Sequence, residues 1–166
     1  MSLSERRTVL IALLGLPLAA CGFAPAYGPG GAASGLLDGV VVDAPTDKNG
    51  FDLVERLEER LGRPEAARFR LSYDIETTVE GQGITTTNAV TRFRINGRVD
   101  YTLVDATGGA PLGRGTVSSF TSYSAFGTPV STLSSEADAS TRLMRLLADQ
   151  IVTRLIATAG SWNHLP

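Results

Sequence analysis

The chain is poor in the residue types that build disulfides, metal centres and most catalytic clusters. It has one cysteine and one histidine among 166 residues. The cysteine has no partner within the chain, and zinc sites draw on several Cys and His ligands together. The histidine, His164, is the third residue from the C-terminus, where fraying is expected. These scarcities argue against a disulfide framework, a Cys/His metal site and a histidine-based catalytic centre.

The sequence also lacks an apolar run long enough to cross a membrane. The uncharged run at residues 8–16 is about ten residues long, whereas a spanning helix needs roughly 20. Arg6 and Arg7 precede this run, and Pro17 and small alanines follow it. A charged segment, a short apolar segment and small residues at a cleavage site are typical of a secretory signal peptide. We therefore predict that residues 1–20 are a signal peptide that is removed.

The lone cysteine follows this segment directly. Residues 18–21, Leu-Ala-Ala-Cys, resemble the bacterial lipobox, in which the cysteine thiol takes a diacylglyceryl group and the new amino terminus is acylated as well. Two or three acyl chains anchor a protein stably where one chain would be marginal. The absence of Asp after Cys21 is typical of lipoproteins sorted to the outer membrane. The alternative is an ordinary signal peptide followed by a free cysteine.

No catalytic or phosphate-binding motif emerges from the rest of the chain. The glycine pairs at 81–83 and 113–115 lack the third glycine and the strand-to-helix setting of a phosphate loop. Asp74 and Glu76 share one strand parity, but arginines of the same parity suggest an ion lattice rather than paired catalytic carboxylates. We predict no catalytic residue, no metal and no cofactor other than the covalent lipid on Cys21.

The mature chain, residues 21–166, has the size of one ordinary domain. The whole chain has 15 basic and 17 acidic side chains, and loss of Arg6, Arg7 and Glu5 leaves 13 and 16, a net charge of −3. This balance gives no sign of a nucleic-acid partner. We predict a lipidated cysteine with a flexible Gly/Ala/Pro-rich tether at 21–35, a single domain at 36–160 and a tail at 161–166.

Apolar periodicity predicts a strand and a helix at the start of this domain. Residues 36–42 include three adjacent valines, which favours a strand covered on both faces. Asn49 can cap a helix that Gly62 and Pro64 would end. Its predicted apolar stripe consists of Phe51, Val54, Leu57 and Leu61.

The middle of the chain predicts a hairpin and a third antiparallel strand. Apolar residues share one parity over residues 69–79 and again over 89–103, with a turn offered by Gly81-Gln82-Gly83. The second of these strands would span roughly 50 Å at 3.3 Å per residue, so we expect a bend or bulge at Gly97. A Ser/Thr-rich strand over 113–123 completes the meander.

A long helix over residues 135–157 is predicted to close the domain, capped by Ser134 or Ser135. Its expected stripe is Ala137, Thr141, Leu143, Met144, Leu147, Ala148, Ile151, Leu155 and Ile156. All stripes can be buried in two layers. The predicted fold class is therefore α+β: a two-layer sandwich with a four-stranded, mixed, mostly antiparallel sheet, two helices on one face, and the order β-α-β-β-β-α.

Five arginines share the parity opposite the apolar side chains of the predicted strands. Guanidinium groups pair well with phosphates and carboxylates. We therefore expect a basic band on the uncovered sheet face that could contact an anionic lipid headgroup, and the alternative is a solvated, salt-bridged outer face. The band consists of Arg68, Arg70, Arg92, Arg94 and Arg98.

Several stretches of the mature chain resemble the LptE family of lipopolysaccharide-assembly outer-membrane lipoproteins, in its alphaproteobacterial form. The mature start Cys-Gly-Phe-Ala-Pro-Ala-Tyr-Gly, at 21–28, is similar to the Cys-Gly-Phe-x-Pro-x-Tyr opening of that family. Residues 122–126, 136–139 and 146–155 are similar to the passage from its last strand into its C-terminal helix. The resemblance covers essentially the whole mature chain.

This resemblance implies a protein anchored to the periplasmic side of the outer membrane. LptE-like proteins plug the lumen of the β-barrel LptD, help it assemble, and bind lipopolysaccharide on its way to the outer leaflet. By this analogy the turn at 81–83, with Thr85, Thr86 and Thr87, would point into the barrel. The arginine band would meet carboxylates of the barrel wall or phosphates of lipid A.

Two other functions remain open from the sequence. One is an auxiliary lipid-binding lipoprotein of an ABC-type envelope lipid transporter, which would share the anchor and the size. The other is an envelope hydrolase, against which the missing nucleophile and base already count.

Overall fold

The computed structural model describes residues 28, 31, 34–84, 90–109, 111–125 and 127–162. The predicted signal peptide, Cys21, Thr85–Thr87 and His164 lie outside the described residues. The element order confirms the predicted β-α-β-β-β-α arrangement and the α+β fold class. The elements are β1 (Val40–Val42), α2 (Lys48–Leu61), β2 (Phe69–Ile84), β3 (Val90–Asp105), β4 (Gly113–Ser124) and α3 (Pro129–Ala159).

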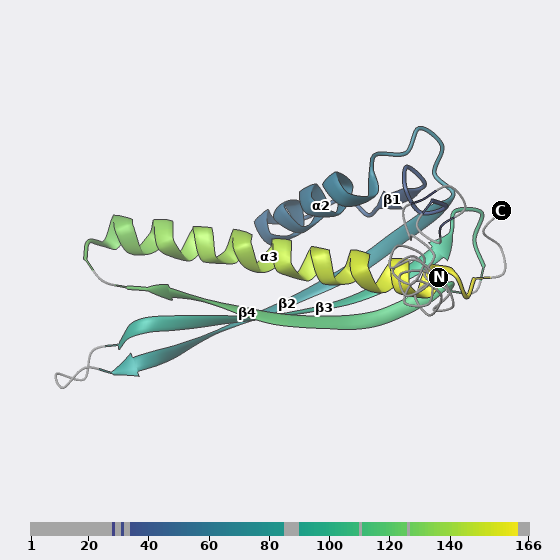
Figure 1. Cartoon of the computed structure of the whole chain (residues 1–166). Coiled ribbons are helices and arrows are strands. Elements are labelled where there is room, and N and C mark those ends of the chain that lie inside the picture. Colours follow the sequence, from purple (N-terminus) through teal and green to yellow (C-terminus); the bar gives the residue numbers. More distant parts are fainter. Residues whose placement is uncertain are drawn as a thin grey trace, which may run out of the picture.

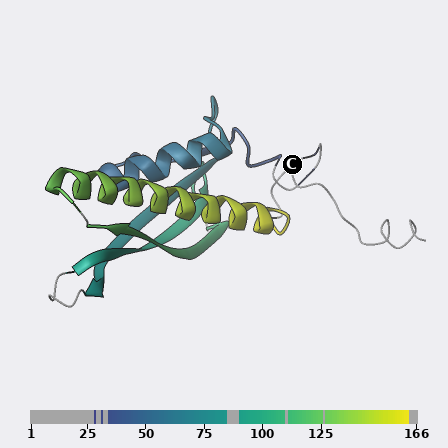
Figure 2. The ribbon, with the colours of Figure 1, turned by 60° about the vertical axis from the view of Figure 1, so that its left-hand side comes forward.

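The four strands form one sheet in the order β1-β2-β3-β4. β1 runs parallel to β2, and the other neighbours are antiparallel. Both helices lie on the same side of this sheet, so the molecule has two layers (Figures 1 and 2). The core fills the space between the layers, with side chains such as Leu71, Val99 and Leu147 fully buried.

The molecule is elongated along the β2–β3 hairpin and α3 (Figure 1). We call the end with the hairpin tip and the start of α3 the distal end. The proximal end holds β1 and the C-terminal end of α3, where Trp162 packs near Phe69 with ring centroids 6.5 Å apart. α3 runs along most of the sheet, whereas α2 covers only part of it (Figure 1).

The first strand is shorter and less covered than the sequence predicted. Residues 34–39 form turns, and only Val40–Val42 pair with β2. Val40 is buried, but Val41 is 40% exposed, so coverage on both faces was wrong. The reason is that β1 lies at the edge of a sheet whose helices cover one face only.

Helix α2 begins at Lys48, with Asp47 rather than Asn49 as its N-cap: the Asp47 side chain accepts a hydrogen bond from the Gly50 amide at 2.7 Å. Phe51, predicted to be apolar core, is 59% exposed, and Leu53 is buried instead. These two residues are two positions apart, about 200° around a helix, so they cannot share one face.

The Gly81–Gly83 turn was also wrong, because these residues lie within β2 and pair with β3. The pairing shifts register between Gly81 and Gly83, so the glycines mark an irregularity of the ladder rather than its end. Gly97 lies on the helix side of β3, where an added Cβ would come within 3.0 Å of Leu143 and Leu147. It allows α3 to approach the sheet closely.

Helix α3 starts six residues before the predicted position. Thr128 is the N-cap, accepting a hydrogen bond from the Ser131 amide, and Pro129 is the first helical residue. Ser135, predicted as a possible cap, lies within the helix and donates to the Ser131 carbonyl. Most of the predicted stripe is buried, but Ala137 is exposed and Ala139 takes its place in the core.

Candidate functional site

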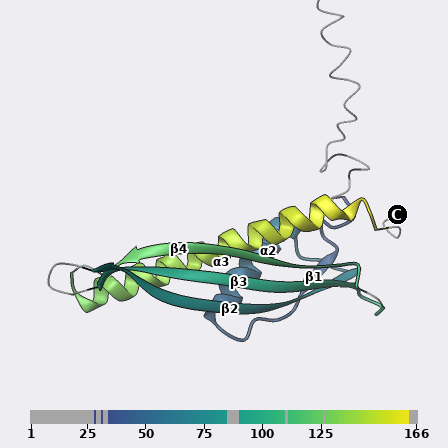
Figure 3. The same cartoon turned by 90° about the horizontal axis from the view of Figure 1, so that it is seen from below.

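The sheet leaves one face uncovered by helices (Figure 3), and the side chains on it are mostly polar. We call it the open face. It carries the even-numbered residues of β2, β3 and β4, because neighbouring odd-numbered residues such as Leu71, Val99 and Val117 point into the core. The register places Glu76, Arg98 and Ser118 in one row across the three strands.

The structure divides the five predicted arginines into groups with different surroundings. Arg68 precedes β2, donates to the Gly35 carbonyl at the proximal end, and lies over the Phe69 ring. The other four lie on the open face, in β2 and β3.

Two of these four arginines are engaged within the molecule. Arg70 donates to Asp43 at 2.6 Å, just after β1. Arg98 contacts Asp100 at 3.1 Å along β3 and donates to Thr116 at 3.2 Å on β4. Their charge is therefore already compensated by the sheet's own carboxylates.

The remaining two, Arg92 and Arg94, form no ion pair with any residue that the structure describes. The Arg94 guanidinium lies 4.2 Å from the centroid of the Phe120 ring on β4. Its Nε is buried and has no hydrogen-bond partner. A buried donor without an acceptor costs about 1–3 kcal/mol. Because the chain itself covers this Nε, a group from outside would have to contact the Arg94 guanidinium at another of its nitrogens.

The predicted cross-strand ion lattice of Asp74 and Glu76 with the arginines of β3 was wrong: among the described residues no ion pair joins β2 to β3. Within the described residues neither carboxylate has an ion pair, and Asp74 stands opposite Asp100 in the register. The Thr116 hydroxyl, and then Arg98, lower the pKa of the Asp100 carboxyl below its ordinary value. The carboxylate form of Asp100 is thereby favoured although Asp74 faces it.

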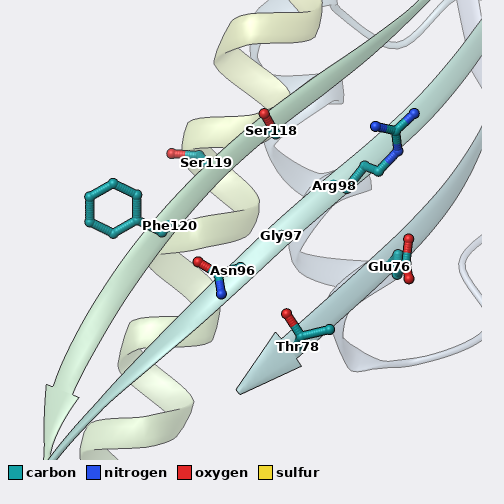
Figure 4. A pocket seen from close by; sticks show the side chains of 8 residues that line it. All are labelled: Glu76, Thr78, Asn96, Gly97, Arg98, Ser118, Ser119 and Phe120. Carbon is teal, nitrogen blue, oxygen red and sulfur yellow. The ribbon is translucent and has the colours of Figure 1, made fainter. Parts of the chain in front are cut away.

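The open face is hollowed near its middle into a shallow depression of about 420 Å³ (Figure 4). Its walls come from all three long strands, which contribute hydroxyl, amide and charged groups beside apolar carbon surface. The lining residues are Glu76, Thr78, Asn96, Gly97, Arg98, Ser118, Ser119 and Phe120. Such a surface can hydrogen-bond to a partner, and within the described residues no hydrogen bond joins its serines to Glu76.

Phe120 is the residue of this face that the sequence analysis missed. It is 55% exposed and shares the outward parity of the serines around it. The signal was present in the sequence: Val117 and Tyr123 share one parity of β4, and Phe120 breaks it. The Phe120 ring provides the surface against which the Arg94 guanidinium packs.

Across the described ranges there is no cluster of three His, Cys, Asp or Glu side chains suited to a metal ion. No helix among these residues is both long enough and apolar enough to span a membrane.

A family model identifies the chain. The model of the LptE family, described as lipopolysaccharide-assembly, matches residues 37–155. The chain belongs to the LptE family. This confirms the resemblance found in the sequence and supports a role in lipopolysaccharide assembly for a protein of a non-enzymatic lipoprotein family. A search among curated proteins found no match.

Solved structures of bacterial lipoproteins share the fold. A lipoprotein from Caulobacter crescentus CB15 matches with a TM-score of 0.65 and 20% identity, covering 78% of this chain and 96% of that one. Rare lipoprotein B from Shewanella oneidensis matches with a TM-score of 0.58 and 12% identity, covering 76% and 98%. A minor lipoprotein from Acinetobacter baumannii matches with a TM-score of 0.51 and 19% identity, covering 72% and 89%.

Proposed function

We propose that this LptE-family protein is an outer-membrane lipoprotein, held on the periplasmic side by lipid on Cys21, that plugs an LptD-like β-barrel. In this role it helps the barrel to assemble and assists lipopolysaccharide transport to the outer leaflet. The observation that carries the proposal is the open face of an elongated, two-layered molecule in a chain of this family (Figure 3). A plug in a wet barrel lumen needs such a polar surface.

The two uncompensated arginines supply the contact with an anion. Arg92 and Arg94 lie in β3 near the distal end of the open face. Guanidinium groups bind phosphate or carboxylate oxygens in pairs. We propose that they meet either phosphates of lipopolysaccharide or carboxylates of the barrel wall, whereas Arg70 and Arg98 serve mainly to hold the sheet's own acidic groups.

The plug role is tested by a detergent pull-down of the full-length chain, tagged at its C-terminus, from its native outer membrane. We expect a β-barrel protein of LptD size in stoichiometric amount, identified by mass spectrometry. Recovery of the chain alone would refute the plug role. Recovery with inner-membrane transporter subunits would favour an auxiliary lipoprotein of an ABC-type lipid transporter instead.

The arginine contact is tested by reversing both charges, Arg92→Glu and Arg94→Glu. We expect lipopolysaccharide affinity to fall at least about tenfold, with unchanged helical circular dichroism, because two charge-assisted contacts become repulsive. The matched control is Arg142→Glu with Arg145→Glu, which makes the same charge change on exposed positions of α3. An unaltered affinity in the first variant would assign the two arginines to the barrel wall or to solvent.

A further inference from the structure

The outer edge of β4 is an unpaired strand edge. β4 is the last strand of the sheet and pairs only with β3. The Ala125 amide donates to the Thr91 carbonyl, so the pair Thr91 and Ala125 is hydrogen-bonded. Hydrogen-bonded and non-bonded pairs alternate along an antiparallel ladder, and the register has no shift. The backbone groups of Ser118, Phe120 and Ser122 therefore point away from β3.

Within the described residues, α3 bonds to an outward backbone group of β4 at one place. Arg154 of α3 donates to the Thr116 carbonyl. Beyond that point, no residue that the structure describes bonds to the outward backbone groups of Ser118, Phe120 or Ser122. The free stretch thus runs from Ser118 to the end of the strand.

The two long edges of the sheet differ in protection. β2 also lacks a neighbour beyond Leu71, but this stretch carries the carboxylates Asp74, Glu76 and Glu80 and ends in a glycine-rich irregularity. Charges and irregularities of this kind keep natural edge strands from pairing with other chains. The β4 stretch from Thr116 to Ser124 contains no charged residue, no proline and no glycine.

The chemistry beside the free edge indicates which strand would suit it. Arg94 reaches from β3 across β4 to stack on Phe120, and its buried Nε lacks an acceptor. A strand added beside β4 would bring its own open-face side chains next to Phe120. A carboxylate there could accept from another nitrogen of the Arg94 guanidinium.

We propose that the edge of β4 from Ser118 to Ser124 pairs with an extended segment of a partner polypeptide that presents carboxylates on the open face. Strand addition of this kind takes its affinity from main-chain hydrogen bonds and its specificity from alternate side chains. A second copy of this chain fits less well, because pairing β4 with β4 would bring two positive Arg94 side chains toward one another. The inference shares Arg94 with the proposed anion contact, but its test contains neither lipopolysaccharide nor a barrel, so its failure would leave the plug role intact.

The test uses the full chain in detergent micelles and two nine-residue probes, one alternating Thr with Glu and one alternating Thr with Lys. We expect the Thr/Glu peptide to slow hydrogen exchange of the Ser118, Phe120 and Ser122 amides at least about tenfold by NMR, and the Thr/Lys peptide to have little effect. No protection, equal protection by both peptides, or protection in a dimer without peptide would overturn the proposal.

Two variants separate the edge from general binding. Ser122→Pro removes one outward amide and leaves the bonds to β3 in place, so it should abolish protection by the Thr/Glu peptide, whereas Ser122→Ala should keep it. Arg94→Gln keeps the edge but loses the charge and should weaken binding of this peptide about tenfold. Full protection in the proline variant would refute the edge as the site, and full protection in the glutamine variant would refute the carboxylate contact with Arg94. Either result overturns the proposal, so the glutamine variant still tests it if the proline variant does not fold.

Discussion

At the scale of single residues, the fold depends on glycines at positions where a larger side chain would clash with its neighbours. Gly97 is one: the Leu143 and Leu147 side chains occupy the space above it. Gly115 is another, since an added Cβ would come within 2.8 Å of the Tyr101 hydroxyl. Both glycines lie on the helix side of the sheet, where they let α3 and the Tyr101 ring pack against the backbone.

Gly97→Val should destabilise the protein by about 1–3 kcal/mol, because the added methyl groups overpack a filled core. Asn96→Val, one residue away on the open face, is the matched control and should stay within about 0.5 kcal/mol. Urea unfolding followed by circular dichroism measures both. Equal free energies of unfolding for the two variants would show that the close approach of α3 to Gly97 does not contribute to stability.

The open-face arginines show how neighbours decide the role of one residue type. Arg70 and Arg98 have carboxylates within 3.1 Å, whereas Arg94 has an aromatic ring and an unsatisfied Nε. All of them follow the same alternation in the sequence. Alternation predicts the face of a side chain, but its partners come from other strands.

At the scale of elements, the helices are held by buried stripes and by a small polar interface between them. Asp149 of α3 forms ion pairs with Arg56 and Arg60 of α2. The distances from its Oδ1 to the guanidinium nitrogens are 3.0 and 2.7 Å. The buried Asp52 of α2 accepts from the Thr141 hydroxyl at 2.8 Å. These contacts set how α2 lies along α3, while the stripes bind both helices to the sheet.

The stripe of α3 can be tested with two adjacent leucines. Leu147 is fully buried and Leu146 is 45% exposed. Leu147→Ala should cost about 2–5 kcal/mol through lost burial and a cavity, and Leu146→Ala less than about 1 kcal/mol. Chemical denaturation of both variants gives the comparison. A larger loss for Leu146→Ala would mean that the helix is rotated relative to the described packing.

At the scale of the whole molecule, the two layers bury the core between them and leave two surfaces with different characters. The open face (Figure 3) is polar, and the β4 edge is uncharged beyond Thr116. A molecule with one polar face and one free edge would suit a partner that surrounds it. This is the arrangement that the proposed plug role requires.

The anchor is tested by Cys21→Ser, which removes the thiol that would take the lipid. We expect the variant to incorporate no labelled palmitate during growth in the native host, because serine offers no thiol to take the lipid. Wild-type protein and Gly22→Ala serve as controls that should take up the label. Labelling of the serine variant equal to that of the wild type would refute lipid attachment at Cys21.

Much of the fold could be predicted from the sequence, because local spacing reports the direction of side chains. The alternation over residues 69–79 and 89–103 predicted the central hairpin, and the stripe around Leu147 predicted α3. The early start of α3 was missed although Thr128-Pro129 is a start signal of its own. The hairpin turn was placed too early because the glycines at 81–83 mark an irregularity within a strand.

The sequence by itself determined the order of the elements and the face of each long strand that is apolar, because the helical and extended backbones impose their own periods on side chains. Only the tertiary structure decided which arginines are compensated and which edge is left free. Those properties depend on residues far apart in the chain, as when Asp43 reaches Arg70 or Arg154 covers Thr116. Such long-range contacts follow from how the layers pack, and no local sequence pattern encodes them.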